Sequence, residues 1–585
     1  MMKALLLAAA LALPGAPAMA MDDDSGRSAE RAEPPRQLNE GERAEYRAIF
    51  QAIHDGRWTD ASARLDALPD GVLKNVALAE MYLAPGSPRV EKEPILALLE
   101  RAPELPEAPQ LARLAKARGV EELPLLPQPQ AMIFLGGQPR RVRAKSTKND
   151  PVAAELDPLI QPLIVADHPA DAELLLQGRE TELSPEALTE FRQRIAWSYY
   201  LIGDDGSARR IAGLARSGAG DWVVQAHWTV GLAAWRAGDC KEAADAFSAV
   251  AATASDPELN AAGHYWAARA EMVCVRPERV QPHLRTAARM GETFYGLLSA
   301  SALGMKDPTA ALLHDYRDSE WRGIANKPNV RAAIALMEVG ERALADTFVS
   351  WQARIGSATD HNGLLHLAAD LDLAGTQFWL AHNAPAGARV NMSARYPRPE
   401  WKPVRGWRVD QSLAYAHALQ ESNFRTQTVS PAGAMGLMQV RPGTAGDIAR
   451  ARGEPFSASQ LSEPAANLEF GQTFLETLRD NSGTGGLLPK VIAAYNAGPV
   501  PVAQWNTRRM DNGDPLLYIE SIPYWETRGY VPSVLRNYWI YEQEAGRSGG
   551  SREALAQGMW PRFPGMPGAR AVRMQPDKAY ASSTD

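Results

Sequence analysis

The chain has 585 residues, of which 45% are hydrophobic, 22% charged and 7% aromatic, a globular composition that disfavours a largely disordered chain, a collagen-like repeat and a multi-span membrane protein. The formal net charge of −7 provides no broad basic surface, so nucleic acid is not expected as a partner. The chain has only two cysteines and ten histidines, which disfavours a disulfide framework and a histidine-rich metal centre. Its length suits several domains, or a solenoid joined to a compact unit.

The N-terminus has the pattern of a cleavable secretory signal over residues 1–20. Lys3 precedes an apolar run, and Ala18-Met19-Ala20 places small residues before a cleavage point. Two prolines break the run and three aspartates follow it, which disfavours a membrane anchor of about twenty uninterrupted apolar residues. No cysteine follows that could carry a lipid. We therefore expect an exported, soluble, periplasmic protein with no stable membrane span.

A repeat of helical hairpins is predicted for the N-terminal half. Polar residues 21–40 predict a flexible lead-in, whereas residues 41–308 are rich in alanine with helical periodicity. An aromatic residue, a Gly-Asp pair and an alanine occur twice, 35 residues apart, as Tyr200, Gly203, Asp204 and Ala208 and as Trp235, Gly238, Asp239 and Ala243. This spacing is typical of tetratricopeptide-like units, in which glycine ends one helix and alanine lets the next approach closely. We expect an α-superhelical solenoid over residues 41–308.

Both cysteines fall within this solenoid. Cys240 begins one predicted helix and Cys274 ends the next, so an antiparallel hairpin would place them side by side. A disulfide between them is possible in an oxidising compartment, and two buried thiols are the alternative.

A proline-rich and basic segment, residues 124–150, interrupts the helical pattern. Its cations are Arg140, Arg141, Arg143, Lys145 and Lys148. They could form a patch for an anionic polymer, but runs of charge usually face water, and a solvated insertion loop is the favoured interpretation.

Three further units complete the expected organisation. Residues 309–392 predict a small helical linker domain, and the prolines between 396 and 403 predict a rigid link after it. Residues 393–545 form the next domain. Residues 546–585 are rich in Gly, Ser, Pro and Arg without periodicity, which predicts a disordered tail.

A candidate general acid lies early in the 393–545 domain. Asp410 is a suitable N-cap for a helix that begins at Gln411. Glu421 then falls in the last turn, beside apolar residues and the negative end of the helix. Both influences raise the pKa of a carboxyl group, as a general acid near neutral pH requires. A glutamate at a helix end is, by itself, more often a surface residue.

Several motifs follow Glu421 in a fixed order. They are Glu421-Ser422, Ser430-Pro431-Ala432-Gly433-Ala434-Met435-Gly436-Leu437-Met438-Gln439, Ala494-Tyr495-Asn496-Ala497-Gly498, Glu520-Ser521-Ile522-Pro523 and Glu526-Thr527-Arg528. Over roughly residues 410–541 this pattern resembles the catalytic domain of the soluble lytic transglycosylases of bacterial cell walls, a domain related to goose-type lysozyme. The resemblance implies a mainly α-helical protein, with a superhelical domain and a linker domain before a lysozyme-like catalytic domain at 393–545.

The resemblance also implies roles for individual residues. Glu421 would be the catalytic residue, and Glu520 would be a supporting second carboxylate. The implied substrate-binding residues are Ser430, Met438, Gln439, Tyr495, Asn496 and Glu520. Aromatic residues of this segment could stack on sugars or pack in the core; they are Tyr495, Trp505, Tyr518, Tyr524, Trp525 and Tyr530. His417 is expected to be a packed or surface side chain rather than a metal ligand.

The chemistry implied is non-hydrolytic cleavage of peptidoglycan glycan strands. Glu421 would protonate the oxygen of the MurNAc-β-1,4-GlcNAc bond, and the substrate's acetamido group would stabilise the anomeric carbon. Glu421 would then take the proton of the C6 hydroxyl, which closes a 1,6-anhydro-MurNAc ring. No cofactor or metal is implied. The alternatives are a hydrolytic, lysozyme-like muramidase and a non-catalytic periplasmic scaffold that binds glycan.

Overall fold

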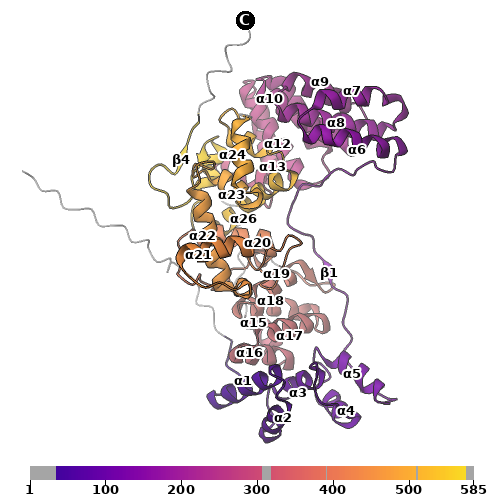
Figure 1. The fold of residues 1–585 in the computed structure, drawn as a ribbon, viewed down its shortest axis with the longest axis vertical. Helices are drawn as coiled ribbons and strands as arrows, with labels where there is room; N and C mark the ends of the chain where they lie inside the picture. The colour runs from indigo at the N-terminus through magenta and orange to yellow at the C-terminus, as the bar shows by residue number, and fades with distance from the viewer. Residues whose placement is uncertain (1–33, 306–317, 391, 509–510, 575–585) are drawn as a thin grey trace, which may run out of the picture.

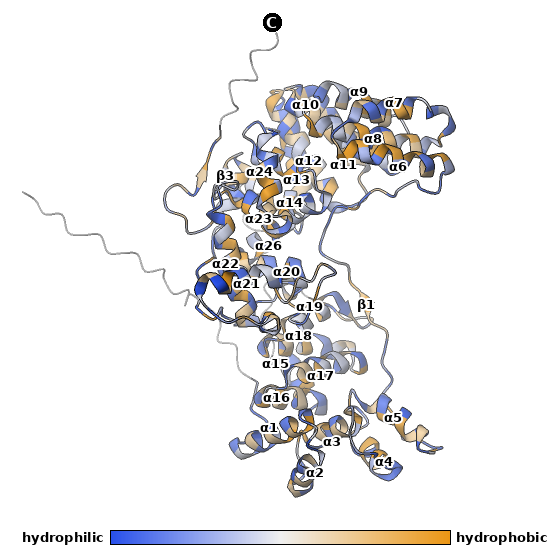
Figure 2. Ribbon diagram, in the orientation of Figure 1, coloured by the Kyte–Doolittle hydropathy of each residue, from blue (hydrophilic) through white to orange (hydrophobic). Residues whose placement is uncertain are grey.

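The computed structural model describes residues 34–305, 318–390, 392–508 and 511–574. The predicted signal at 1–20 and most of the predicted lead-in at 21–40 lie outside these residues. The described chain is mainly α-helical, as predicted, and its helices carry both hydrophobic and hydrophilic residues (Figure 2). Two short antiparallel pairs join β1 (Ile133–Phe134) to β2 (Asn383–Ala384) and β3 (Trp560–Pro561) to β4 (Ala571–Val572). In the described part of the chain, no helix combines the length and apolar character needed to cross a membrane.

The first helices pack against the linker domain, at the bottom of Figure 1, and the two sets share one hydrophobic core, which we call the lower body. Its helices are α1 (Glu40–His54), α2 (Trp58–Ala67), α3 (Lys74–Leu83), α4 (Lys92–Arg101), α5 (Ala108–Ala117), α15 (Asp318–Ile324), α16 (Pro328–Val339), α17 (Arg342–Ile355), α18 (His361–Asp370) and α19 (Ala374–His382). The Glu338 carboxylate on α16 accepts hydrogen bonds from the backbone N–H groups of Gln37 and Leu38, at 2.6 and 3.3 Å. The expected single solenoid over 41–308 is therefore wrong at its N-terminal end.

The remaining helices of that region form a continuous stack, which we call the solenoid. They are α6 (Pro151–Val165), α7 (Pro169–Gln177), α8 (Pro185–Leu201), α9 (Asp205–Ala215), α10 (Trp222–Arg236), α11 (Cys240–Thr253), α12 (Pro257–Val273), α13 (Pro277–Ala288) and α14 (Phe294–Ala302). Both predicted repeats fold alike: Asp204 caps α9 and Asp239 caps α11, each through its side chain. The preceding glycines, Gly203 and Gly238, have φ of 90° and 78°, a conformation that glycine adopts without a steric penalty.

Cys240 and Cys274 form a disulfide, with their Cα atoms 5.5 Å apart. Cys240 is the first residue of α11 and Cys274 caps the C-terminus of α12. The bond thus ties together the open ends of the α11–α12 hairpin, and the alternative of two free thiols does not apply.

The segment between α5 and α6 runs along one side of the molecule and connects the lower body to the solenoid (Figure 1). β1 lies in this segment and pairs with the linker domain through β2. Further along, Arg141 is buried against the C-terminal domain, where its guanidinium group makes two hydrogen bonds to Glu520. The expectation of a solvated loop at 124–150 is therefore wrong for this part of the segment, because the segment serves as a strap between domains.

The C-terminal domain, residues 393–574, packs against the solenoid and shares its hydrophobic core. Its helices are α20 (Gln411–Ser422), α21 (Pro442–Arg452), α22 (Pro464–Arg479), α23 (Leu488–Ala497), α24 (Pro499–Thr507), α25 (Pro515–Glu520), α26 (Trp525–Glu544) and α27 (Gly550–Ala556). The interface includes a Phe294–Trp539 ring stack with centroids 5.0 Å apart and an Arg269–Asp514 ion pair of 2.7 Å.

The expected disordered tail at 546–585 is wrong for residues 546–574. Here the chain forms α27, β3 and β4. Leu555, Trp560 and Phe563 are buried, and the Trp560 indole N–H donates a hydrogen bond to the Gly513 carbonyl at 2.8 Å. The isolated apolar residues of this segment lack a helical period because they fill separate positions on the C-terminal domain rather than one helix face.

Candidate active site

Glu421 occupies the last turn of α20, as predicted. The Asp410 carboxylate caps the helix by accepting a hydrogen bond from the Ser412 N–H at 2.8 Å. Most residues of α20 are buried, whereas Glu421 is partly exposed. Glu421 therefore lies at the surface of a helix that is held firmly by the domain core. The helix ends at Asn423, which has φ of 52°, and the chain then turns away.

Glu421 receives a hydrogen bond from α26. The Tyr530 hydroxyl donates to Oε1 of Glu421 at 2.6 Å and also lies 2.9 Å from Nδ1 of His417. Since the tyrosine hydrogen points to the carboxylate, Nδ1 of His417 must carry the hydrogen of the second bond. Burial lowers the pKa of His417 to about 3, so the ring is neutral. A neutral histidine therefore orients Tyr530, and Tyr530 in turn fixes one oxygen of Glu421.

The environment raises the pKa of Glu421 to about 7, mainly because burial disfavours the charged form. The Tyr530 hydrogen bond acts in the opposite direction, and the negative charge of Glu526 raises the value further. The group is thus divided between its protonated and ionised forms near neutral pH, as the sequence pattern predicted.

Tyr495, at the end of α23, lies beside this arrangement. Its hydroxyl donates to the Met438 carbonyl at 2.8 Å, and its ring lies 4.5 Å from that of His417. Burial and the nearby Glu421 carboxylate raise the pKa of Tyr495. The structure therefore brings Tyr495 to Glu421, whereas the Met438 side chain is fully buried and cannot line a cleft. Met438 contributes its backbone carbonyl instead.

Ser430 and Gln439 lie in the looped segment between α20 and α21, and both are partly exposed. The Gln439 side chain donates to the carbonyls of Thr428 and Gly436, at 3.1 and 2.8 Å. The Ser430 hydroxyl accepts from the Ala434 N–H at 3.0 Å. These contacts hold the loop in shape, and any contact of the two side chains with substrate stays a prediction.

Asn496 on α23 and Glu526 on α26 contact each other near Glu421. The Asn496 amide donates to the Glu526 carboxylate at 3.3 Å and accepts from the Thr527 hydroxyl at 2.5 Å. Glu526 is exposed, and its negative charge raises the pKa of Glu421. The sequence motifs include Glu526 but imply no role for it, and they do not indicate that Tyr530 positions Glu421. Their spacing, four residues apart on α26, was the available signal, because it places both on one helix face.

Glu520 is buried away from solvent, so the direct substrate contact expected for it is wrong, and its role as a supporting carboxylate stays a prediction. Its carboxylate is completely buried, bound by Arg141 at 2.6 and 2.7 Å and by the Tyr295 hydroxyl at 2.6 Å. Among the aromatic candidates, Trp505 and Tyr518 are also buried, so they serve packing, whereas Tyr524 is half exposed.

Residues 402–517 match the Transglycosylase SLT domain. This chain contains a transglycosylase SLT domain. Curated relatives support the assignment: the soluble lytic murein transglycosylase of Salmonella typhimurium is 38% identical over 154 residues, which is 26% of this chain and 23% of the relative. The protein of that name from Escherichia coli K12 is 39% identical over 132 residues, 22% of this chain and 20% of the relative. The matches thus span about a quarter of those proteins or less.

Solved structures extend the likeness to the whole fold. The 70 kDa soluble lytic transglycosylase of Escherichia coli superposes with a TM-score of 0.56 at 17% identity, covering 89% of this chain and 99% of that one. A lytic transglycosylase of Pseudomonas aeruginosa gives a TM-score of 0.50 at 19% identity, covering 86% of each chain. The resemblance to soluble lytic transglycosylases read from the sequence motifs is confirmed.

Proposed function

We propose that this protein is a periplasmic peptidoglycan lytic transglycosylase in which Glu421 acts as general acid and then as general base. The observation that carries the proposal is the position of Glu421, with a pKa of about 7 and one oxygen held by Tyr530, within a transglycosylase SLT domain. The secretory pattern at residues 1–20 supports export to the periplasm.

The geometry suits both proton transfers. Because Tyr530 occupies Oε1, the proton of the neutral acid resides on Oε2, from which it passes to the glycosidic oxygen of the MurNAc-β-1,4-GlcNAc bond. The bond breaks, and the substrate's acetamido oxygen stabilises the anomeric carbon. The ionised Glu421 then takes the proton of the C6 hydroxyl, whose oxygen closes the 1,6-anhydro ring. Tyr530 stabilises the carboxylate between the two steps, because its hydrogen bond favours the ionised form.

The decisive test replaces Glu421 with glutamine and measures the release of soluble muropeptides from purified sacculi. We expect the rate to fall by about a hundredfold or more, since positioned proton transfer contributes roughly 10²–10⁴-fold. Glu553→Gln is the matched control, because Glu553 is an exposed carboxylate on α27 and its loss should leave the rate unchanged. Near-normal activity of Glu421→Gln would disprove the role.

Mass spectrometry of the wild-type products separates the remaining candidates. An anhydro product supports transglycosylation, and a product heavier by one water identifies a lysozyme-like muramidase. Binding to sacculi without any release would instead indicate a glycan-binding scaffold.

A further inference from the structure

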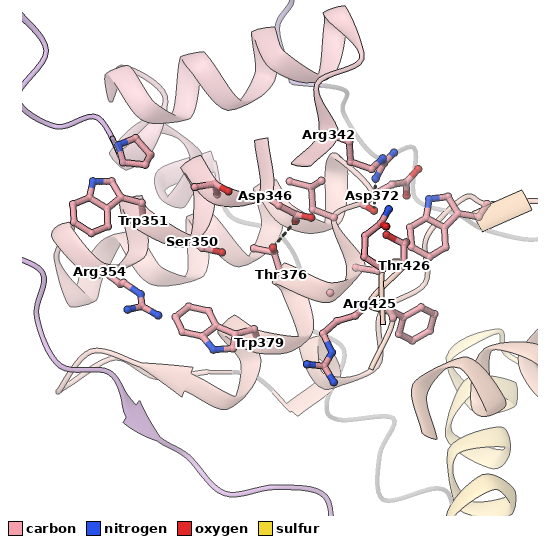
Figure 3. Close-up of a pocket in the computed structure, with 18 residues that line it drawn as sticks. Arg342, Asp346, Ser350, Trp351, Arg354, Asp372, Thr376, Trp379, Arg425 and Thr426 are labelled. Atoms are coloured by element: carbon pink, nitrogen blue, oxygen red, sulfur yellow. Dashed lines mark hydrogen bonds between the residues drawn. The ribbon is translucent and has the colours of Figure 1, made fainter. Parts of the chain in front are cut away.

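A pocket of about 590 Å³ lies outside the site of Glu421, between the linker domain and the C-terminal domain (Figure 3). The linker helices α17 and α19 form one wall, and residues 424–427, which follow α20, form the other. Phe424 is only three residues beyond Glu421, so this wall begins within about 11 Å of the Glu421 backbone. The pocket is therefore close to Glu421 along the chain, but it lies where the linker domain meets the C-terminal domain.

Aromatic rings make up much of the pocket. Trp351, Trp379 and Trp401 all line it, and each is only partly buried. The Trp351 indole N–H is fixed by a hydrogen bond of 2.9 Å to the Glu104 carbonyl. Arg342 lies 6.0 Å from the centre of the Trp401 ring. Partly exposed indole rings beside guanidinium groups offer flat apolar surfaces, which suit the faces of sugar rings.

The same pocket carries three guanidinium groups. Arg354 lies 5.3 Å from the centre of the Trp379 ring, Arg342 donates to the Asp372 carbonyl at 2.9 Å, and Arg425 donates to the Ser422 carbonyl at 3.1 Å. Across the described residues, none of the three is paired with a carboxylate within 4.0 Å, although ion pairs are common elsewhere in the chain. Arginine binds carboxylates through paired N–H donors, so these groups are available to an anionic ligand.

The tryptophan rings and the arginine side chains together indicate a ligand that carries both a sugar and carboxylates. We propose that this pocket binds a carboxylate-bearing glycopeptide unit of the glycan strand, with a sugar on the indole rings and carboxylates on Arg354 and Arg425. The proposal rests on the proposed function, because it identifies the ligand as part of the same polymer. A strand held here while it lies at Glu421 would be anchored at two points, which raises its effective concentration at the carboxylate.

Binding to the full-length protein tests this assignment. The probe is a purified disaccharide-tetrapeptide muropeptide, and the protein carries Glu421→Gln so that bound ligand is not consumed. We expect calorimetry to report two bound equivalents, and hydrogen exchange to slow in α19. Adding Trp379→Ala or Arg354→Ala should reduce the stoichiometry to one and abolish protection of α19. Arg354 is exposed, so its loss carries little risk to folding.

Two controls make the test specific. Arg285→Ala removes an exposed arginine of α13, remote from the pocket, and should leave both equivalents bound. Chitotetraose has similar sugars without carboxylates and should bind the pocket roughly tenfold more weakly or worse, since a hydrogen bond to a charged group contributes about 1.5–3 kcal/mol.

A single equivalent in every variant, or equal protection of α19 by chitotetraose, would overturn the proposal. If the proposed function were wrong, the wild-type protein would release no muropeptides from sacculi. The binding assay does not depend on turnover, so the two outcomes can be told apart.

Discussion

At the scale of single residues, burial and the opposing hydrogen bond from Tyr530 together set the pH range over which Glu421 can act as an acid. Glu421 must be protonated to donate, so kcat/KM should fall as pH rises through the pKa of about 7. Tyr530→Phe removes a bond that favours the ionised form, and the pKa of Glu421 should rise. We expect the alkaline limb of the kcat/KM profile to move up by roughly one to two pH units, the equivalent of a hydrogen bond to a charged group.

Glu526→Gln provides the opposing variant. The negative charge of Glu526 raises the pKa of Glu421, so its removal should move the same limb to lower pH, while the glutamine oxygen can still accept the bond from Asn496. A purely structural defect would lower the rate without these opposite displacements. If both variants moved the limb in one direction, the account of Glu421 would be wrong.

The sequence predicted the position of a residue correctly where that residue's environment is local. Glu421 could be placed because its cap, Asp410, and its helix lie within twelve residues of it in the chain. Glu520 could not, because its partner Arg141 comes from a segment 379 residues earlier, and nothing near Glu520 in the sequence signals a buried ion pair. Met438 failed for a related reason, since burial of its side chain depends on the packing of the loop on α22 beside Gly471.

At the scale of elements, the loop between α20 and α21 depends on the close approach of Gly436 to its neighbours. Gly436 has φ of 74°, and a Cβ there would lie 2.0 Å from the Leu461 carbonyl oxygen and 2.3 Å from the Asn467 amide nitrogen. Both are held in the core, so Gly436→Ala must displace the loop that carries the carbonyl bound by Tyr495. We expect this variant to lower the free energy of unfolding by well over the roughly 1–2 kcal/mol that left-handed backbone alone costs.

Gly433→Ala is the matched comparison within the same loop. Its φ is 76°, but a Cβ there would meet nothing within 4 Å. Gly433→Ala should therefore lower the free energy of unfolding, measured in urea, only by the cost of the left-handed backbone, about 1–2 kcal/mol. Equal losses for the two variants would indicate that the contacts of Gly436 do not matter.

Sequence periodicity predicted the helical character of residues 41–308 and 309–392, because each helix buries a stripe of its own residues. It did equally well for the hairpin repeats, whose Gly-Asp signal recurs at Gly203 and Gly238. It failed for residues 546–574, where Trp560 and Phe563 are anchored one at a time against a surface built by other elements. Such anchoring leaves no period to detect.

At the scale of the whole molecule, the strap between α5 and α6 joins parts that the chain order separates. Besides Arg141, its Pro139 carbonyl and the Gln138 side chain accept hydrogen bonds from Arg536 on α26, at 2.6 and 2.9 Å. The same helix carries Tyr530, so the strap braces the element that positions Glu421. Contacts between residues so distant in sequence have no local signature, so the sequence alone predicts a solvated loop for this segment.

The Arg141–Glu520 pair allows a direct test of the strap. The two side chains are 13% and 1% exposed, and Arg141 also lies 4.7 Å from the centre of the Trp228 ring. Either Arg141→Met or Glu520→Gln leaves a buried charge without its partner, which should cost about 3–5 kcal/mol of unfolding free energy. The double variant removes both charges and keeps an apolar chain against Trp228. Its loss of unfolding free energy should be smaller than the sum of the two single losses by about 2 kcal/mol or more. Urea unfolding of the four proteins measures this coupling, and strictly additive losses would show that the pair is not what holds the strap to the C-terminal domain.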